Sequence, residues 1–176
     1  MAKEKNKALV CIVMGSDSDY SIMEEAASIL KAFDVPFELL VTSAHRSPER
    51  TRKEVKRATR DGVKIFIAGA GAAAHLAGVI AGETVLPVIG VPISATPLNG
   101  LDSLLSTAQM PGGVSVACMA IGKPGARNAG VLAVQILALS DSKLSAKLLR
   151  YKKDLALEVQ RKSKKLHMAH AKGQKN

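Results

Sequence analysis

The sequence contains little cysteine, few aromatic residues and no long hydrophobic run. Its two cysteines, Cys11 and Cys118, lie inside apolar segments, so we expect buried, reduced thiols. Neither a Cys-x-x-Cys pair nor clustered histidine, cysteine and carboxylate residues occur, and no metal site is expected. Because no stretch of about 18 apolar residues is present and the initial MAKEKNK does not resemble a signal peptide, we expect a soluble, cytoplasmic protein that does not cross a membrane.

The whole chain carries a formal net charge of +10, but most of the chain lacks an excess of basic over acidic residues. Residues 143–176 hold 11 basic and two acidic residues, whereas residues 1–142 hold 14 basic and 13 acidic ones. Apolar residues recur at helical spacing in 143–176, which predicts a long basic amphipathic helix. Aromatic side chains that could stack on bases are not interleaved with these charges, so we expect solvent or a neighbouring subunit against this helix, and no nucleic acid.

Short hydrophobic runs rich in β-branched residues alternate with helix-like segments before this tail. Nearly continuous hydrophobicity is typical of strands buried on both faces of a parallel sheet. Five β/α units predict a doubly wound α/β domain over 1–142, with 143–176 as a helix belonging to the same domain or to a subunit interface. The expected strands are 7–14, 36–43, 63–69, 85–91 and 114–120, and the expected helices are 19–33, 48–60, 72–82, 100–109 and 125–140.

Polar and glycine residues concentrate in the loops that follow the expected strands. In an open α/β sheet, ligands bind beyond the carboxyl ends of the strands. We therefore expect a ligand site to be assembled from several of these loops, which are 15–19, 43–47, 69–75, 92–95 and 121–125.

The loop MGSDSD, residues 14–19, has two interpretations. Ser16 and Asp19 are residue types that commonly cap a helix. Backbone N–H groups at a helix start can also bind phosphate, and a carboxylate can accept hydrogen bonds from ribose hydroxyls. Helix capping and a mononucleotide-like site both remain open from this loop alone.

The loop SAHRSP, residues 43–48, places a histidine beside an arginine. Pro48 suits the first position of a helix, with Ser47 as its cap. His45 and Arg46 then remain in the loop, at the ligand edge of the sheet. An isolated histidine is more often structural than catalytic, whereas a guanidinium is suited to bidentate phosphate binding.

The segment AGAGAAAHLAG, residues 68–78, offers almost no side chains. Such a run allows close approach of either a flat ligand or a packed helix to the backbone. The loop QMPGGVSV, residues 109–116, is rich in glycine and proline at its start and is interpreted as a flexible cover.

Taken together, the motifs MGSDSD, SAHRSP, AGAGAAAHLAG, GVP, LNGLDSLLSTAQMPGGVSV and AIGKPGARNA resemble, in this order and spacing, the PurE family of purine biosynthesis. The resemblance covers about residues 8–141, and AHRSP, GAAAHLAG and QMPGG look like the bacterial class I members. It implies a three-layer, flavodoxin-like fold with a five-stranded parallel sheet. It also implies a homo-octamer whose active sites lie at subunit contacts.

The resemblance further implies an activity. Class I members move a carboxylate from the exocyclic amine of N5-carboxyaminoimidazole ribonucleotide to a carbon of its imidazole ring, without ATP, metal or organic cofactor. A transient hand-off of this unstable carbamate from the ATP-dependent carboxylating synthetase fits that chemistry. Class II members, which carboxylate aminoimidazole ribonucleotide directly with CO2, are the nearest alternative.

Site residues follow from the resemblance motif by motif. The family's general acid/base matches His45, and its mobile cover over the substrate matches Gln109, Met110 and Pro111. His75 either lies near a site or packs against a helix. The residues that match or adjoin the family's substrate-binding positions are Ser16, Ser18, Asp19, Ser43, Arg46, Ala70, Gly71, Ala72 and Met110.

Two functions from other classes are alternatives. A non-catalytic nucleotide-binding or signalling module would not require His45, and a receiver domain would place an acceptor aspartate where this chain has Ala68-Gly69-Ala70. Nucleic-acid binding through the terminal helix predicts an affinity that depends steeply on salt.

Overall fold

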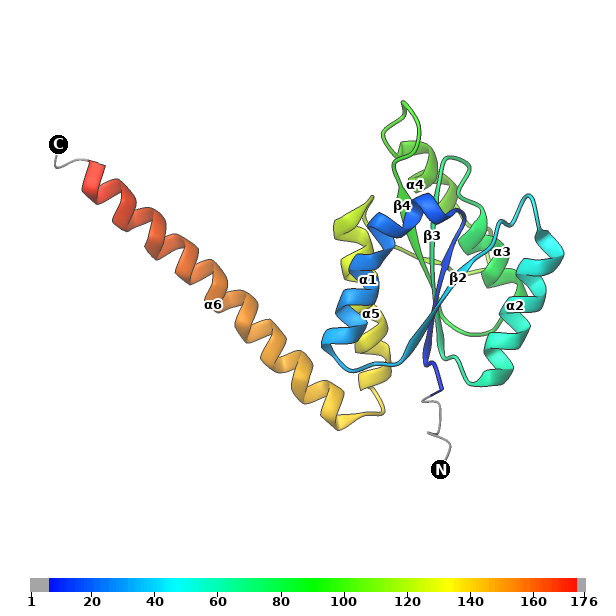
Figure 1. Ribbon diagram of the computed structural model, residues 1–176, viewed down its shortest axis with the longest axis horizontal. Coiled ribbons are helices and arrows are strands. Elements are labelled where there is room, and N and C mark those ends of the chain that lie inside the picture. Colours follow the sequence, from blue (N-terminus) through cyan, green and yellow to red (C-terminus); the bar gives the residue numbers. More distant parts are fainter. Residues whose placement is uncertain (1–6, 174–176) are drawn as a thin grey trace. The chain divides into compact units, whose positions relative to one another are not determined.

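A five-stranded parallel sheet forms the centre of the computed structural model, which describes residues 7–173 (Figure 1). The strand order is β2-β1-β3-β4-β5. Because β1 pairs with both β2 and β3, Cys11 lies opposite Glu38 on one side and opposite Phe66 on the other. The predicted α/β fold is confirmed. The strands are β1 (Val10–Met14), β2 (Phe37–Val41), β3 (Ile65–Gly71), β4 (Val88–Ile93) and β5 (Ala117–Cys118).

Helices cover both faces of the sheet and complete three layers. α1 and α5 lie side by side on one face (Figure 1), where a Cβ added at Gly130 would stand 2.8 Å from the Cβ of Ile29. On the other face, a Cβ added at Gly90 of β4 would meet Thr107 of α4 and Ala77 of α3, so these two helices share that face with α2. The helices are η1 (Asp17–Asp19), α1 (Tyr20–Ala32), α2 (Pro48–Asp61), α3 (Leu76–Glu83), α4 (Leu101–Ala108), α5 (Lys123–Ala138) and α6 (Ser142–Gly173).

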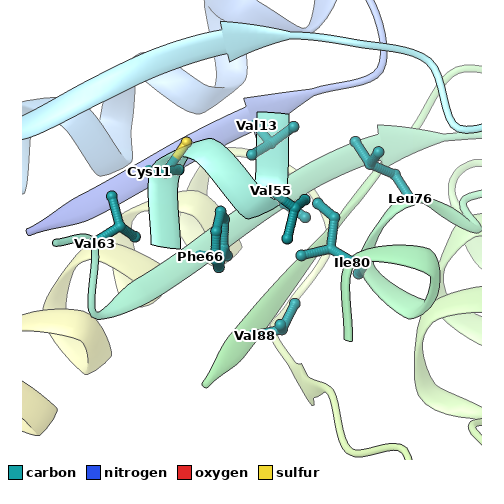
Figure 2. Close-up of a cluster of buried hydrophobic side chains, with 11 residues drawn as sticks. Cys11, Val13, Val55, Val63, Phe66, Leu76, Ile80 and Val88 are labelled. Atoms are coloured by element: carbon teal, nitrogen blue, oxygen red, sulfur yellow. The ribbon is translucent and has the colours of Figure 1, made fainter. Parts of the chain in front are cut away.

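The core explains why the strand sequences are almost continuously hydrophobic. All five residues of β1 are buried, and successive side chains of a strand point to opposite faces, so both faces must be covered. Figure 2 shows one face, where Cys11 and Phe66 of the sheet pack with Val55 of α2 and Ile80 of α3. Each fully buried side chain of this size contributes about 1.5–3 kcal/mol. This packing fixes the strands and therefore the ends from which the loops start.

Most strands and helices begin or end a few residues from their predicted bounds, and the differences in β5 and α3 are the most informative. The sequence predicts β5 over 114–120, but this edge strand pairs with β4 through two residues, Ala117 and Cys118. α3 was expected from residue 72 but begins at Leu76. Ala72 has φ 53°, in the left-handed region, which a helix cannot include.

The chain divides into two compact units, residues 1–134 and 135–176, with the division inside α5. The second unit consists mainly of α6, which confirms the predicted long C-terminal helix. Within α6, Glu158 and Lys162 form an ion pair of 2.7 Å one turn apart. Among residues 7–173, the helices are all too short or too polar to cross a membrane.

Candidate functional site

A pocket of about 490 Å³ lies at the carboxyl ends of β1, β2 and β3. Three strand-end loops supply most of its wall, as the rule for open α/β sheets predicts. All predicted binding and catalytic residues except Met110 line it, and they come from the first unit. Its lining consists of Gly15, Ser16, Ser18, Asp19, Ser43, Ala44, His45, Arg46, Ala70, Gly71, Ala72, Ala73, Leu76 and Ala95.

The loop after β1 is held together by its own polar side chains. Ser16 and Asp19 form a capping box at the start of η1, in which the Ser16 backbone N–H donates to Oδ2 of Asp19 over 3.0 Å. The hydroxyl of Ser18 donates to the hydroxyl of Ser16 over 2.9 Å. The capping interpretation of MGSDSD is therefore confirmed, and the same side chains also face the pocket.

Asp19 is a buried carboxylate at the edge of this pocket. Asp19 is 8% exposed, and this burial raises the pKa of its carboxyl group above the usual value. The backbone N–H groups of Ser16 and Gly15 oppose the rise in this pKa, because they donate hydrogen bonds to the ionised form. The loop thus holds a desolvated hydrogen-bond acceptor in a fixed place beside the pocket.

Hydrogen bonds made by the hydroxyl groups of Thr42, Thr51 and Ser47 stabilise the loop after β2. Thr42 and Thr51 are both buried, and their hydroxyl oxygens lie 2.9 Å apart. Ser47 occupies the N-cap position of α2, before Pro48, as predicted. The expected capping by its side chain is wrong, because the Ser47 hydroxyl donates to the carbonyl of Ser43 over 3.0 Å instead.

His45 and Arg46 project from this fixed turn. The backbone N–H of Arg46 donates to the hydroxyl of Ser43 over 3.2 Å, and the Ser47 N–H donates to the Ser43 carbonyl over 2.9 Å. Ser43 therefore closes the turn that carries both side chains. Both residues are exposed in the single chain and line the pocket, which places an imidazole and a guanidinium within reach of one ligand.

Along the pocket wall, the loop after β3 contributes backbone and small apolar side chains, and His75 follows at the end of this loop. A Cβ added at Gly71 would stand 2.5 Å from the Cβ of Ala95 and 3.1 Å from the carbonyl oxygen of Ile93. Gly71 is thus required for close approach to the segment that follows β4, whereas Gly69 in the same run allows close approach of Met23 of α1, so this run also packs against a helix. The left-handed Ala72 then turns the chain along the pocket.

The structure resolves the position of His75. Its Nδ1 lies 2.8 Å from Nε2 of His45, so its ring contacts the other histidine instead of packing against a helix. The lining residues that were not predicted individually are Gly15, Ala44, Ala73, Leu76 and Ala95. All of them except Leu76 lie in the loops expected to form the ligand site, so their position in those loops is the signal that could have found them. Their side chains carry no chemical pattern.

Met110 is not brought to this pocket in the single chain. Its sulfur and terminal methyl would each lie 3.0 Å from a Cβ added at Gly78 of α3. A role of Gln109, Met110 and Pro111 as a cover over the ligand stays a prediction.

The chemical groups of the pocket suit an anionic, hydroxyl-bearing ligand. Hydroxyls and a carboxylate face it from one loop, and a guanidinium and an imidazole face it from another. Within residues 7–173, histidine, cysteine and acidic residues do not form a group of three that could hold a metal ion. A larger hollow of about 950 Å³ is lined by α2 and the end of α3, away from the carboxyl ends of the strands.

Comparisons with known proteins agree on one family. Residues 9–158 match the family described as AIR carboxylase. The chain is 52% identical to the N5-carboxyaminoimidazole ribonucleotide mutase of Pyrococcus horikoshii, over 94% of this chain and 93% of the relative. It is 46% identical to the mutase of Escherichia coli K12, over 90% and 94% of the two chains. The crystal structure of Treponema denticola PurE superposes with a TM-score of 0.79 at 30% identity, covering 86% of this chain and 94% of that one.

Proposed function

The chain belongs to the AIR carboxylase family, also called PurE, and from this membership we propose that it converts N5-carboxyaminoimidazole ribonucleotide to 4-carboxy-5-aminoimidazole ribonucleotide in purine biosynthesis. The observation that carries the proposal is the pocket at the strand ends. It brings His45, Arg46 and the Ser16–Asp19 loop to one ligand-sized space. The mutase names of the relatives support this reaction over direct carboxylation.

The reaction moves one carboxylate and one proton. A proton adds to the carbamate nitrogen, the bond from nitrogen to the carboxyl carbon breaks, and its electron pair stays on the nitrogen as CO2 is released. The ring carbon then attacks CO2, and a base removes the hydrogen of that carbon so that its electron pair restores the ring. The proton consumed at nitrogen equals the proton released at carbon, so no external acid or base is required.

His45 is the residue that gives and takes this proton. An imidazole with an ordinary pKa of about 6.5 is available in both protonation states near neutral pH. One side chain can therefore protonate the nitrogen and later deprotonate the carbon. The exposed position of His45 at the pocket wall supports this role.

Arg46 and the loop after β1 bind the nucleotide. The guanidinium of Arg46 suits bidentate contact with phosphate, with help from Ser18 and the adjoining amides. Ser16 and Asp19 suit the ribose hydroxyls, for which the buried Asp19 carboxylate is a strong acceptor.

The loop after β3 and Ser43 hold the migrating CO2. CO2 is uncharged and small, and it must not escape before it meets the ring carbon. The wall formed by Ala70, Gly71 and Ala72 carries only small, apolar side chains, so it can hold CO2 against the ring while excluding water. Met110 and its neighbours close over the substrate as a cover.

The test is an assay with the carbamate substrate at low bicarbonate, compared with aminoimidazole ribonucleotide plus bicarbonate. Efficient turnover of the carbamate supports the mutase, and efficient carboxylation at low bicarbonate assigns the class II reaction instead. A His45→Asn variant should bind the substrate and fail to turn it over. Near-normal turnover by this variant would overturn the role of His45. His167→Gln, on α6, is the matched control and should behave as the wild type.

The working form is a homo-octamer in the cytoplasm, with active sites at subunit contacts and a transient hand-off of the carbamate from the ATP-dependent synthetase. The exposure of His45 and Arg46 in the single chain supports a neighbouring subunit that completes the site. Mass measurement in solution tests the octamer, and a monomer with full activity would contradict it.

Deleting residues 143–176 tests whether the basic helix binds nucleic acid. If the full chain binds nucleic acid with an affinity that depends steeply on salt, and the shortened chain does not bind it, the helix has a separate function.

A further inference from the structure

A second hollow of the first unit is lined by α2 and the end of α3, away from the carboxyl ends of the strands. The two helices lie side by side on one face of the sheet (Figure 1). An ion pair of 2.8 Å between Arg52 of α2 and Glu83 of α3 joins them beside the hollow. Its volume is about 950 Å³, which lies within the range of about 300–1,000 Å³ that is typical of small-molecule sites. The residues that line it take no part in the reaction proposed above.

Both acidic residues that line this hollow are already paired. Glu54 and two further carboxylates surround the guanidinium of Arg57, with ion pairs of 2.8–2.9 Å. Glu83 is paired with Arg52, whose side chain is not part of the lining. Among the residues that the structure describes, the lining therefore has no further acidic group that could neutralise another cation.

Three cations of the lining have no acidic partner among residues 7–173, and they are Lys53, Lys56 and Arg60. They are three and four residues apart, so they are neighbours on one face of α2. Like charges at this spacing destabilise a helix. The helix dipole explains Arg60, which lies in the last turn, but not Lys53, which lies two turns before the end. An anion in the hollow would offset the repulsion among all three.

The row of cations suits an elongated anion with several negative charges. From residue 53 to residue 60 the helix rises about 10 Å, so the three charges are spread along the hollow. Lysine and arginine both bind phosphate oxygens through charge-assisted hydrogen bonds. A chain of linked phosphates places negative charges at several points along such a row, whereas a single phosphate does not.

The end of α3 adds a hydroxyl group and apolar surface to the other wall. The Thr84 hydroxyl accepts a hydrogen bond from the Leu86 backbone N–H over 3.2 Å, so its own proton can be donated to an anion. Val85, the next residue, is 100% exposed. A Cβ added at Gly82 would meet no atom within 4 Å, so there is open space at this point of the hollow. A phosphate chain along α2 thus leaves an apolar contact for an attached nucleoside.

We propose that the hollow between α2 and α3 is a second binding site, for a ligand that carries a chain of linked phosphates. Lys53, Lys56 and Arg60 bind the phosphates, and the hydroxyl of Thr84 donates to them. Two ligands share this chemistry: inorganic polyphosphate, and a nucleoside triphosphate whose base lies on Val85. The site is separate from the strand-end pocket and does not depend on the reaction proposed there.

A cluster on α6 provides a matched comparison. Arg161, Lys164 and Lys165 line a hollow of about 490 Å³ and likewise comprise one arginine and two lysines. All residues that line it come from α6 alone, so it has no second wall. Such a cluster attracts polyanions only through surface charge that salt screens. The two clusters therefore separate a defined site from general attraction to basic surface.

Isothermal titration of the full chain with sodium tripolyphosphate, in buffer without magnesium, tests the proposal. The Arg46→Ala background is used throughout, so that the strand-end pocket contributes little. Replacing the three cations of α2 should weaken binding by about 10- to 100-fold, whereas replacing those of α6 should leave it unchanged. The two triple variants are Lys53→Gln with Lys56→Gln and Arg60→Gln, and Arg161→Gln with Lys164→Gln and Lys165→Gln.

Two results of this titration would overturn the proposal. One is equal loss of affinity in the two triple variants, which would show general attraction to basic surface. The other is the absence of tripolyphosphate binding when the cations of both clusters are intact. Far-UV circular dichroism checks that each variant folds.

Substitution of Gly82 tests the hollow without removing a cation. Gly82→Glu places a carboxylate in the open space and should weaken tripolyphosphate binding by about 10-fold or more. Gly82→Ala is the matched control and should bind like the parent protein, because a methyl group fits there and alanine favours a helix. Unchanged binding by the glutamate variant contradicts the proposal even if the α2 triple variant does not fold.

Titrations with ATP and AMP distinguish the two ligands. ATP that binds more tightly than tripolyphosphate assigns a nucleoside triphosphate, and Val85→Ser should then weaken ATP binding alone. ATP that binds no more tightly assigns inorganic polyphosphate. AMP has a single phosphate and should bind at least about 10-fold more weakly than ATP. AMP that binds as tightly as ATP would show that the site does not recognise a chain of phosphates.

Discussion

The loops after β1 and after β2 meet in one pocket but are built in different ways. In the first, Ser16 and Asp19 both stabilise the loop and face the ligand space. In the second, Thr51 and its hydroxyl partners stabilise the loop, while His45 and Arg46 project from it. Substitutions should therefore affect stability and ligand binding together in the first loop. In the second loop, Thr51 should affect stability while His45 and Arg46 affect the ligand, and Ser43, which closes the turn and lines the pocket, is the exception.

The largest effect should come from His45→Asn, which tests the separation in the second loop. Turnover should fall by about 10²- to 10⁴-fold, because a positioned general acid/base is removed. The free energy of unfolding should stay within about 0.5 kcal/mol of the wild type, since the side chain is exposed. Steady-state kinetics and urea unfolding measure the two quantities. A large loss of stability would mean that His45 also stabilises the loop.

Arg46→Ala should affect affinity without affecting folding. Loss of a charge-assisted contact to phosphate should weaken substrate binding by about 10- to 100-fold, with stability again nearly unchanged. Isothermal titration with inorganic phosphate and with aminoimidazole ribonucleotide measures it. Unchanged affinity of the variant for both ligands would remove Arg46 from the binding site. Arg127→Ala, on α5, is a control for the lost charge.

Thr51→Val should act in the opposite way, on the fold of the second loop. The change keeps the side-chain shape but leaves the buried hydroxyl of Thr42 without its 2.9 Å partner, at a cost of about 1–3 kcal/mol in unfolding free energy. Urea unfolding tests this. The matched control is Thr59→Val on the same helix, whose hydroxyl donates to the carbonyl of Val55 and which should cost less because residue 59 is exposed. Equal losses of unfolding free energy in the two variants would show that the buried hydrogen bond between Thr42 and Thr51 does not contribute to stability beyond an exposed one.

Asp19→Ala should lower both the stability of the protein and its affinity for the ligand, because Asp19 stabilises the first loop and also faces the pocket. Loss of the cap should cost about 1 kcal/mol, and the ribose contact should be lost as well. Differential scanning fluorimetry with and without aminoimidazole ribonucleotide reports both effects. Lower affinity at unchanged stability would show that Asp19 does not hold the loop.

Asp19→Asn should give the smallest effect, a change in the pH dependence of stability. Burial raises the pKa of Asp19 in the folded protein, so the folded state binds this proton more tightly than the unfolded state. The resulting stability is fully present below the unfolded pKa of about 3.9 and is lost as pH rises through the raised folded value. The asparagine can keep the acceptor for the Ser16 N–H. As pH rises through this window, the free energy of unfolding of the Asp19→Asn variant should therefore increase relative to that of the wild type, as measured by urea unfolding. If the two free energies change with pH in parallel, the raised pKa of the buried Asp19 is contradicted.

Much of the fold could be predicted because hydrophobicity and turn chemistry are local signals. The runs around Val10–Met14 and Ile65–Gly71 had the composition of doubly covered strands, and Pro48 marked the start of α2. The bounds of α3 could not be predicted. A run of alanines favours a helix, but the tight packing of Gly71 against Ala95 and the left-handed Ala72 delay it to Leu76.

The sequence by itself determined the alternation of strands and helices, the chemical groups at the strand ends and, through the whole set of motifs, the family. Only the tertiary structure decided which groups touch. Residues 45 and 75 are 30 positions apart, and their spacing carries no information about a contact. The parallel sheet brings the ends of β2 and β3 to the same edge on either side of β1, and that placement turns two separate histidines into a hydrogen-bonded pair.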